Sequence, residues 1–122
     1  MGIIGPPSGG VGAWSETVSL GPKIEESILV PVAQKIAIRL EAGSSRAYLR
    51  GVIKTKEATT VADTLLTIPV GFRPAVAIYV AWVVNGATGV TLRVETSGIL
   101  VCKTNLGIGN EVPLDGLDWN LT

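Results

Sequence analysis

The sequence contains no histidine and only one cysteine, and these two shortages exclude many kinds of site. Without histidine there is no Ser–His–Asp triad, no His-ligated metal and no histidine-based pH switch. Cys102 alone supplies neither an internal disulfide nor a four-cysteine zinc site. Because no histidine can activate it, Cys102 is expected to be a buried structural thiol. We expect no cofactor and no bound metal.

Charge is also scarce. Charged residues make up 16% of the 122 residues, against about 25% in an average protein. Ten basic and ten acidic residues cancel, so the chain lacks the basic footprint that nucleic acid or an anionic membrane requires. The longest uncharged stretch, Pro74–Leu92, is interrupted by proline, asparagine and glycine and has no helical apolar face. We therefore expect no nucleic-acid partner and no membrane insertion.

Catalytic motifs are missing as well. No serine lies in a G-x-S-x-G elbow, and the glycines at Gly9–Gly12 lack the lysine and the preceding strand of a phosphate-binding loop. The carboxylates are scattered over turns and polar strand faces. Asp115 and Asp118 flank a tight turn, where carboxylates commonly cap backbone amides. The chain is expected not to be an enzyme, and a hydrolase is the disfavoured alternative.

Short apolar segments separated by turn residues are plentiful. In Gln34–Glu41, for example, apolar and charged side chains alternate, as in a half-buried strand. The expected strands are 14–20, 28–33 (an edge strand or an extended connection), 34–41, 47–54, 64–68, 76–84, 90–95, 99–103 and one or two short ones within 112–121. This spacing, without a helical repeat, predicts an all-β fold, a single-domain antiparallel β-sandwich of jelly-roll-like type spanning residues 13–122.

Three local features refine this expectation. Gly51 marks a bulge or a close approach within its strand. Asn85-Gly86 predicts a hairpin, either tight or widened to Gly89. The segment Val76–Val84 is apolar on both faces, which is typical of a strand covered on both sides. Its two aromatic residues, Tyr79 and Trp82, are therefore expected to pack in the core or between subunits.

Residues 1–12, MGIIGPPSGGVG, form a Gly/Pro-rich N-terminal arm that cannot pack a core by itself. We expect this arm to hold the domain to something larger. The candidate attachment residues in the arm are Ile3, Ile4, Pro6 and Pro7.

One stretch is more specific. Thr67–Pro74 reads as a strand end followed by P-x-G-F-R-P; Tyr48–Ile53 precedes it and Leu114–Leu117 follows it. This order resembles the tip (knob) domains of tailed-bacteriophage tail fibres and baseplate proteins, with their "LRG" strand, "LPxG[YF]RP" turn and terminal "LDG". The resemblance implies an all-β knob that forms a homotrimer without catalysis. It also implies binding to host-surface carbohydrate or to another virion protein.

The physical chemistry of the turn agrees with a structural use. Pro69 ends the strand, Gly71 permits a positive φ, and Pro74 fixes the return of the chain. Phe72 is the aromatic residue of the motif. Arg73 is the only charged residue between Asp63 and Arg93, so a defined hydrogen bond is expected for it.

The leading expectation is a non-enzymatic structural protein of a phage virion, assembled in the bacterial host cytoplasm. It would be a homo-oligomer, a trimer by the resemblance, because an apolar and weakly charged surface is best buried between subunits. The first alternative is a capsid decoration, cement or head-fibre protein attached to another virion protein through the arm. A second is a carbohydrate-binding module. The aromatic content of 5% is low for a sugar-binding face.

Overall fold

The fold is known from a computed structural model, which describes residues 13–27, 35–41 and 45–122. These residues form β-strands and no helix, which confirms the all-β prediction. The strands are β1 (Ser19–Leu20), β2 (Ile24–Glu26), β3 (Ala37–Leu40), β4 (Arg46–Arg50), β5 (Val52–Thr55), β6 (Thr64–Thr67), β7 (Ile78–Val84), β8 (Ala87–Val94), β9 (Ile99–Cys102), β10 (Glu111–Pro113) and β11 (Asp118–Asn120).

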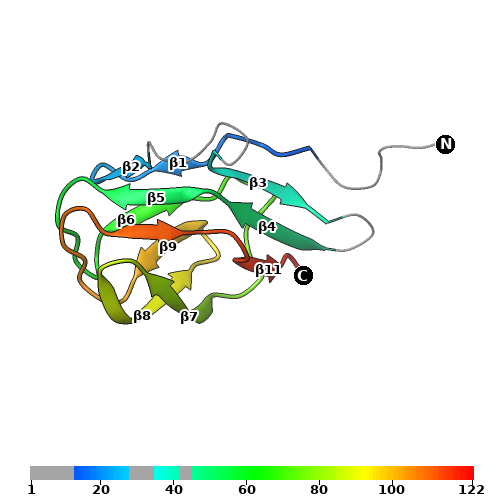
Figure 1. The fold of residues 1–122 in the computed structure, drawn as a ribbon. Coiled ribbons are helices and arrows are strands. Elements are labelled where there is room, and N and C mark those ends of the chain that lie inside the picture. The colour runs from blue at the N-terminus through cyan, green and yellow to red at the C-terminus, as the bar shows by residue number, and fades with distance from the viewer. Residues whose placement is uncertain (1–12, 28–34, 42–44) are drawn as a thin grey trace.

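The strands form three antiparallel sheets. The largest has five strands in the order β1-β6-β9-β8-β7, and the two smaller sheets have the orders β10-β5-β2 and β11-β4-β3. The smaller sheets are continuous along the chain, because β4 and β5 are separated only by Gly51 and follow one another end to end (Figure 1). A turn at Asp115-Gly116 separates β10 from β11 in the same way. The two small sheets therefore act as one long, interrupted layer.

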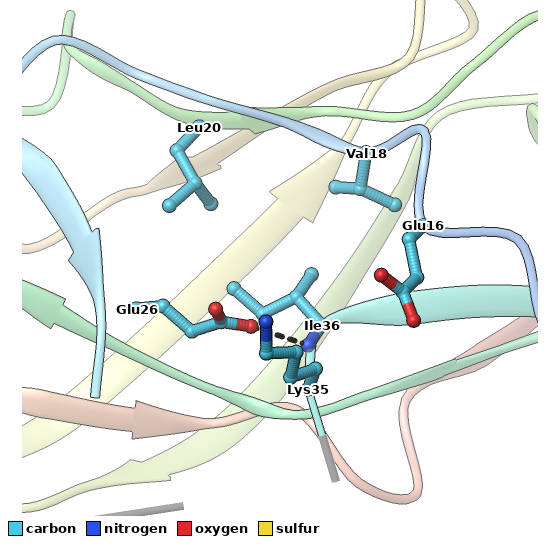
Figure 2. A pocket seen from close by; sticks show the side chains of 6 residues that line it. All are labelled: Glu16, Val18, Leu20, Glu26, Lys35 and Ile36. Carbon is cyan, nitrogen blue, oxygen red and sulfur yellow. Dashed lines mark hydrogen bonds between the residues drawn. The ribbon is translucent and has the colours of Figure 1, made fainter. Parts of the chain in front are cut away.

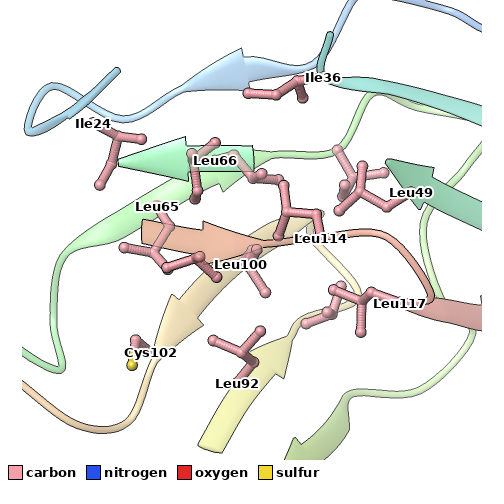
Figure 3. Packing of buried hydrophobic residues seen from close by; sticks show 14 of the residues in the cluster. Ile24, Ile36, Leu49, Leu65, Leu66, Leu92, Leu100, Cys102, Leu114 and Leu117 are labelled. Atoms are coloured by element: carbon pink, nitrogen blue, oxygen red, sulfur yellow. The ribbon is translucent and has the colours of Figure 1, made fainter. Parts of the chain in front are cut away.

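A single hydrophobic core draws side chains from all three sheets, which makes the fold sandwich-like. Figure 3 shows Leu66 and Leu100 from the five-stranded sheet close to Leu49 and Leu114 from the other layer. All four are almost fully buried. Burial of a leucine side chain stabilises the folded state by roughly 1.5–3 kcal/mol, so this shared core is what holds the two layers together.

Most of the expected strands are present. The strand 47–54 is divided at Gly51, where φ is +112° and an added Cβ would lie 2.7 Å from the Cα of Ile36. The predicted close approach at Gly51 is thus confirmed. The hairpin between β7 and β8 is tight: Val84 pairs with Ala87, so only Asn85 and Gly86 form the loop. The wider hairpin is not adopted.

The expected strand 14–20 is wrong as a single element. Ser19 and Leu20 pair with β6 in the five-stranded sheet, whereas Ser15 forms an isolated bridge with Ile38 of the other layer. The segment therefore passes from one layer to the other, and a continuous ladder would require both ends to pair within one sheet. An apolar alternation in the sequence does not reveal such a crossing.

The expectation that 76–84 is covered on both sides is also wrong for the single chain. β7 begins at Ile78 and lies at one end of the five-stranded sheet. Its outward side chains are open to solvent, with Tyr79 60% and Val83 80% exposed. The strand buried on both faces is β9, where Leu100, Val101 and Cys102 are all buried. β9 has strands on either side of it, whereas β7 ends the sheet.

Several sequence predictions concern residues outside the described part of the chain. These are the arm with Ile3, Ile4, Pro6 and Pro7, the strand at 28–33 and the first residue of the strand at 34–41. Within the described ranges, no helix has the length and apolar character needed to cross a membrane.

Candidate functional site

The P-x-G-F-R-P turn is held by its own hydrogen bonds. The Phe72 amide donates to the Pro69 carbonyl at 3.2 Å, and Gly71 takes a φ of +99°. The Nε of Arg73 donates to the Ile68 carbonyl at 2.8 Å. The defined hydrogen bond expected for Arg73 is therefore confirmed, and it closes the turn against the end of β6. Pro74 is buried where the chain leaves the turn.

This turn also joins two distant parts of the chain. The Nε1 of buried Trp119, in β11, donates to the Phe72 carbonyl at 2.6 Å. The Ile68 amide donates to the Gly98 carbonyl at 2.7 Å. An added Cβ at Gly98 would lie 2.5 Å from the Arg73 Nε, so only glycine fits beside the guanidinium. The turn thereby fastens the five-stranded sheet to the other layer.

The other two segments of the resemblance meet each other. The Gly51 amide donates to Asp115 Oδ1 at 3.0 Å, and the Leu114 amide donates to the Gly51 carbonyl at 2.7 Å. The Leu49 amide donates to the Leu117 carbonyl at 3.0 Å. Asp115 therefore caps a backbone amide, but that amide belongs to Gly51, between β4 and β5, and not to the turn that Asp115 flanks.

We call the set of these contacts the motif junction. It comprises Gly51, Ile68, Phe72, Arg73, Gly98, Asp115 and Trp119. The polar groups described above are used by internal hydrogen bonds, and Gly51 and Gly98 lie so close to neighbouring atoms that an added Cβ would not fit. The motif junction therefore holds the fold together.

A second region, the β7 face, has the opposite character. We define it as the outward side chains Tyr79, Ala81 and Val83. Among the described residues, β7 pairs with a strand on one side only. At its hairpin end, the Asn85 amide donates to the Glu111 carbonyl at 3.0 Å. The predicted packing residue Tyr79 is thus exposed on the surface of the chain.

Trp82 lies on the inner side of β7 and is half-buried against the core. Its Nε1 donates to the Pro113 carbonyl at 2.5 Å. Beside this contact is an open, mainly apolar pocket of about 360 Å³, lined by Ala81, Trp82, Val83, Pro113 and Asp115. The β7 face therefore continues into a hollow where β7 meets the end of β10.

A third region was missed by sequence reasoning. The guanidinium carbons of Arg39 and Arg50 lie 4.7 Å and 4.4 Å from the centre of the Trp14 ring. We call this group the arginine–tryptophan stack. The available signal was the alternation in β3 and β4, which places both arginines on the outer face. The alternation does not reveal the bridge between Ser15 and Ile38, which brings Trp14 beside the two arginines.

Tyr48 lies next to this stack on β4, as the Cα partner of Arg39. Its hydroxyl donates to Glu41 Oε1 at 3.0 Å, and this hydrogen bond raises the pKa of Tyr48 above its ordinary value. Its side chain is half-buried on the outer face.

A smaller pocket of about 140 Å³ lies between the two layers. Figure 2 shows Val18 and Leu20 on one side of it and Ile36 on the other, with Glu16 and Glu26 at its margins. Glu26 is already used, because its Oε2 accepts a hydrogen bond from the Ile36 amide at 2.7 Å. Val18, Leu20 and Ile36 supply apolar walls, and Glu16 and Lys35 add a carboxylate and an ammonium group to the lining.

The chemistry available in the described residues is limited. Cys102 is fully buried, as predicted, and burial raises the pKa of its thiol above the ordinary value. A buried thiol with a raised pKa is a poor nucleophile. No group of three His, Cys, Asp or Glu side chains in this part of the chain is placed to hold a metal ion.

Comparison with known proteins gives no relative for this chain. No family model matches the sequence, and neither the curated proteins nor the solved structures yield a match. No known relative therefore indicates a function for this chain.

Proposed function

We propose that this chain is a non-enzymatic structural protein that assembles into a homotrimer through the β7 face. In the proposed setting it is an appendage of a tailed-phage virion, a tail-fibre or baseplate tip that contacts the host surface or another virion protein. The observation that carries the proposal is the exposure of Tyr79 and Val83, 60% and 80%, on an unprotected edge strand.

Edge strands of monomeric proteins are normally protected by charged residues, prolines or bulges, because an open strand pairs readily with other chains. The strand β7 contains neither a charged residue nor a proline between Ile78 and Val84. Its ladder with β8 shifts only between Trp82 and Val84, at the hairpin end. The remaining length of β7 is therefore apolar and unprotected, as expected for a surface that is covered by other subunits.

A threefold arrangement suits this surface. Three copies can bring their β7 faces together around one axis, so that each face is covered by its neighbours. The strand β7 itself brings no charged side chain into the contact, which limits its desolvation cost, and the Arg93 guanidinium, 5.2 Å from the centre of the Tyr79 ring, lies beside it. The finer description of the fold, a jelly-roll-like β-sandwich knob with an attachment arm at residues 1–12, is part of this proposal.

The virion setting is supported by the resemblance to fibre and baseplate tips. All three segments that carry it contribute to the motif junction. If the chain shares the fold of such tips, these three segments should form one structural unit although they lie far apart in the sequence. This setting is tested by labelling virions with an antibody against the chain. Label on the tail supports a tip, label on the head supports capsid decoration, and unlabelled particles contradict the proposal.

The assembly is tested by light scattering on the purified chain at micromolar concentration. The expected mass is three times that of the 12.7 kDa chain. The variant Val83→Lys should reduce the mass to that of a monomer, because it places a charge in the apolar contact. The matched control is Ile108→Lys, at a residue that is 74% exposed in a loop far from β7 in sequence. A monomeric wild type would contradict the proposal.

A further inference from the structure

The outer face of the β11-β4-β3 sheet gathers basic and aromatic side chains. In β4, the outward residues Arg46, Tyr48 and Arg50 alternate with buried Ala47 and Leu49. Arg39 of β3 is the Cα partner of Tyr48. The sheet therefore carries three arginines and a tyrosine on one face. The three arginines differ in whether another residue of the protein neutralises their charge.

Arg46 is neutralised. Its Nη2 lies 2.5 Å from Asp118 Oδ1, and its Nη1 donates to Asn120 Oδ1 at 3.0 Å. Arg39 and Arg50 form no ion pair with any described residue. Arg50 donates its Nε to the Lys35 carbonyl at 3.0 Å, and its terminal nitrogens form no hydrogen bond with a described residue. The Nε of Arg39 is buried and has no hydrogen-bond partner in the described part of the protein.

Trp14 holds these two uncompensated charges together. The Ser15 amide donates to the Ile38 carbonyl at 2.7 Å, and the Ile38 amide donates to the Ser15 carbonyl at 2.9 Å. This pair of bonds fixes Trp14 beside Arg39, and its ring attracts both guanidinium groups. Two like charges on one ring repel each other, and a bound anion would relieve that repulsion.

We propose that the arginine–tryptophan stack is a binding site for an oxyanion, the carboxylate or phosphate group of an anionic glycan. Guanidinium groups present planar, paired donors that match such oxygens. The half-buried ring of Tyr48, beside Arg39, offers an apolar surface on which the attached sugar ring can lie. The inference rests on the proposed function only for the source of the glycan, the host surface.

The site is tested by titrating the full chain at low ionic strength and following tryptophan fluorescence. The probes are sodium glucuronate and inorganic phosphate, with glucose as the neutral control. Wild type should show saturable binding of an anion and no response to glucose. The double variant Arg39→Gln/Arg50→Gln should bind roughly tenfold more weakly or worse, because charge-assisted hydrogen bonds are lost.

The matched control is Arg93→Gln. Arg93 also stacks on an aromatic ring, 5.2 Å from the centre of Tyr79, but as a single guanidinium on the five-stranded sheet. It should leave anion binding unchanged. The variant Arg39→Lys/Arg50→Lys keeps both charges but loses the planar donors, so an intermediate affinity is expected. Far-UV circular dichroism at matched concentrations checks that each variant is folded.

The outcomes separate clearly. Tighter binding of glucuronate indicates a carboxylated glycan, and tighter binding of phosphate indicates a phosphorylated one; either supports the inference. Absence of saturable anion binding in wild type would overturn it, as would equal weakening in Arg93→Gln. Oligomeric mass is measured separately, so a monomer that binds glucuronate would contradict the proposed assembly and leave this site standing.

Discussion

The motif junction combines glycines, aromatic residues and two charged residues, the β7 face holds Tyr79, Ala81 and Val83, and the two regions behave in opposite ways. At the motif junction, the polar groups of Gly51, Phe72, Arg73, Asp115 and Trp119 find partners inside the chain. At the β7 face, apolar side chains and a strand edge lack an internal partner among the described residues.

The difference indicates where function should be sought. Residues that form a recognisable sequence motif can serve to maintain the fold, with all of their polar groups bonded inside the chain. The surface that contacts other molecules is then found where exposed groups are left unsatisfied, as at the β7 face and the arginine–tryptophan stack. Substitutions should therefore affect stability at the motif junction and assembly at the β7 face.

The largest effect on stability is expected for Gly51→Val. Gly51 has a φ of +112°, and an added Cβ would lie within 3 Å of three atoms of Ile36, two of them backbone. Strain and displacement together should cost about 3 kcal/mol or more. The control is Gly71→Ala, where φ is +99° but an added Cβ meets no atom within 4 Å. Urea unfolding measures both, and equal losses would contradict the role of Gly51.

A smaller loss is expected for Trp119→Phe. This variant retains a buried ring but removes the hydrogen bond to the Phe72 carbonyl at 2.6 Å. An unsatisfied buried carbonyl and a small cavity should cost about 2 kcal/mol. The comparison is Trp82→Phe, which removes the more exposed hydrogen bond to Pro113. If Trp82→Phe lost more stability than Trp119→Phe, the hydrogen bond of Trp119 would not be the stronger of the two.

Asp115→Ala should destabilise by about 1 kcal/mol, because it removes the acceptor for the Gly51 amide. The side chain of Asp115 is at the surface, so water can replace part of the lost interaction. Glu57→Ala is the control, since Glu57 is exposed in a loop. Thermal unfolding of the two variants side by side should separate them, and identical midpoints would count against the Asp115–Gly51 contact.

The smallest effect concerns Asp63, away from both regions. The Thr60 amide, which donates to Asp63 at 2.8 Å, and then Lys23 Nζ at 3.1 Å lower the pKa of this carboxyl below its ordinary value of 3.8. A lowered pKa in the folded state means that the stabilisation is present above pH 3.8 and is lost as the pH falls through the lowered value.

Unfolding of wild type and Asp63→Asn in urea across this pH range provides the check. The difference in stability between the two proteins should shrink in acid. A constant difference at every pH would mean that the Asp63 contacts do not depend on its charge.

The fold was largely accessible from the sequence because strand alternation and turn residues are local signals. The strand β8, with Val90, Leu92 and Val94 inward, and the hairpin at Asn85-Gly86 follow directly from them. The crossing of Ser15 from one layer to the other was not accessible, because it depends on which strand is nearest in space. For Tyr79 the sequence left core packing and subunit packing open, because an apolar strand at the end of a sheet has the same sequence pattern as one in the middle.

The candidate sites were less accessible. The turn residues Pro69 to Pro74 were identified correctly, and the hydrogen bond of Arg73 was anticipated. The arginine–tryptophan stack joins residues 14, 39 and 50, and no spacing rule connects them. In the structure, Arg46 pairs with Asp118, whereas Arg39 and Arg50 have no ion-pair partner among the described residues.

Hydrogen–deuterium exchange at increasing protein concentration tests the contrast between the two regions most directly. Amides of the motif junction, such as those of Gly51 and Leu114, should be protected equally at every concentration, since their partners are internal. Amides of β7 should become protected as the concentration rises and subunits cover the strand. If the exchange of β7 is fast and independent of concentration while the chain stays monomeric, the β7 face is not a subunit contact.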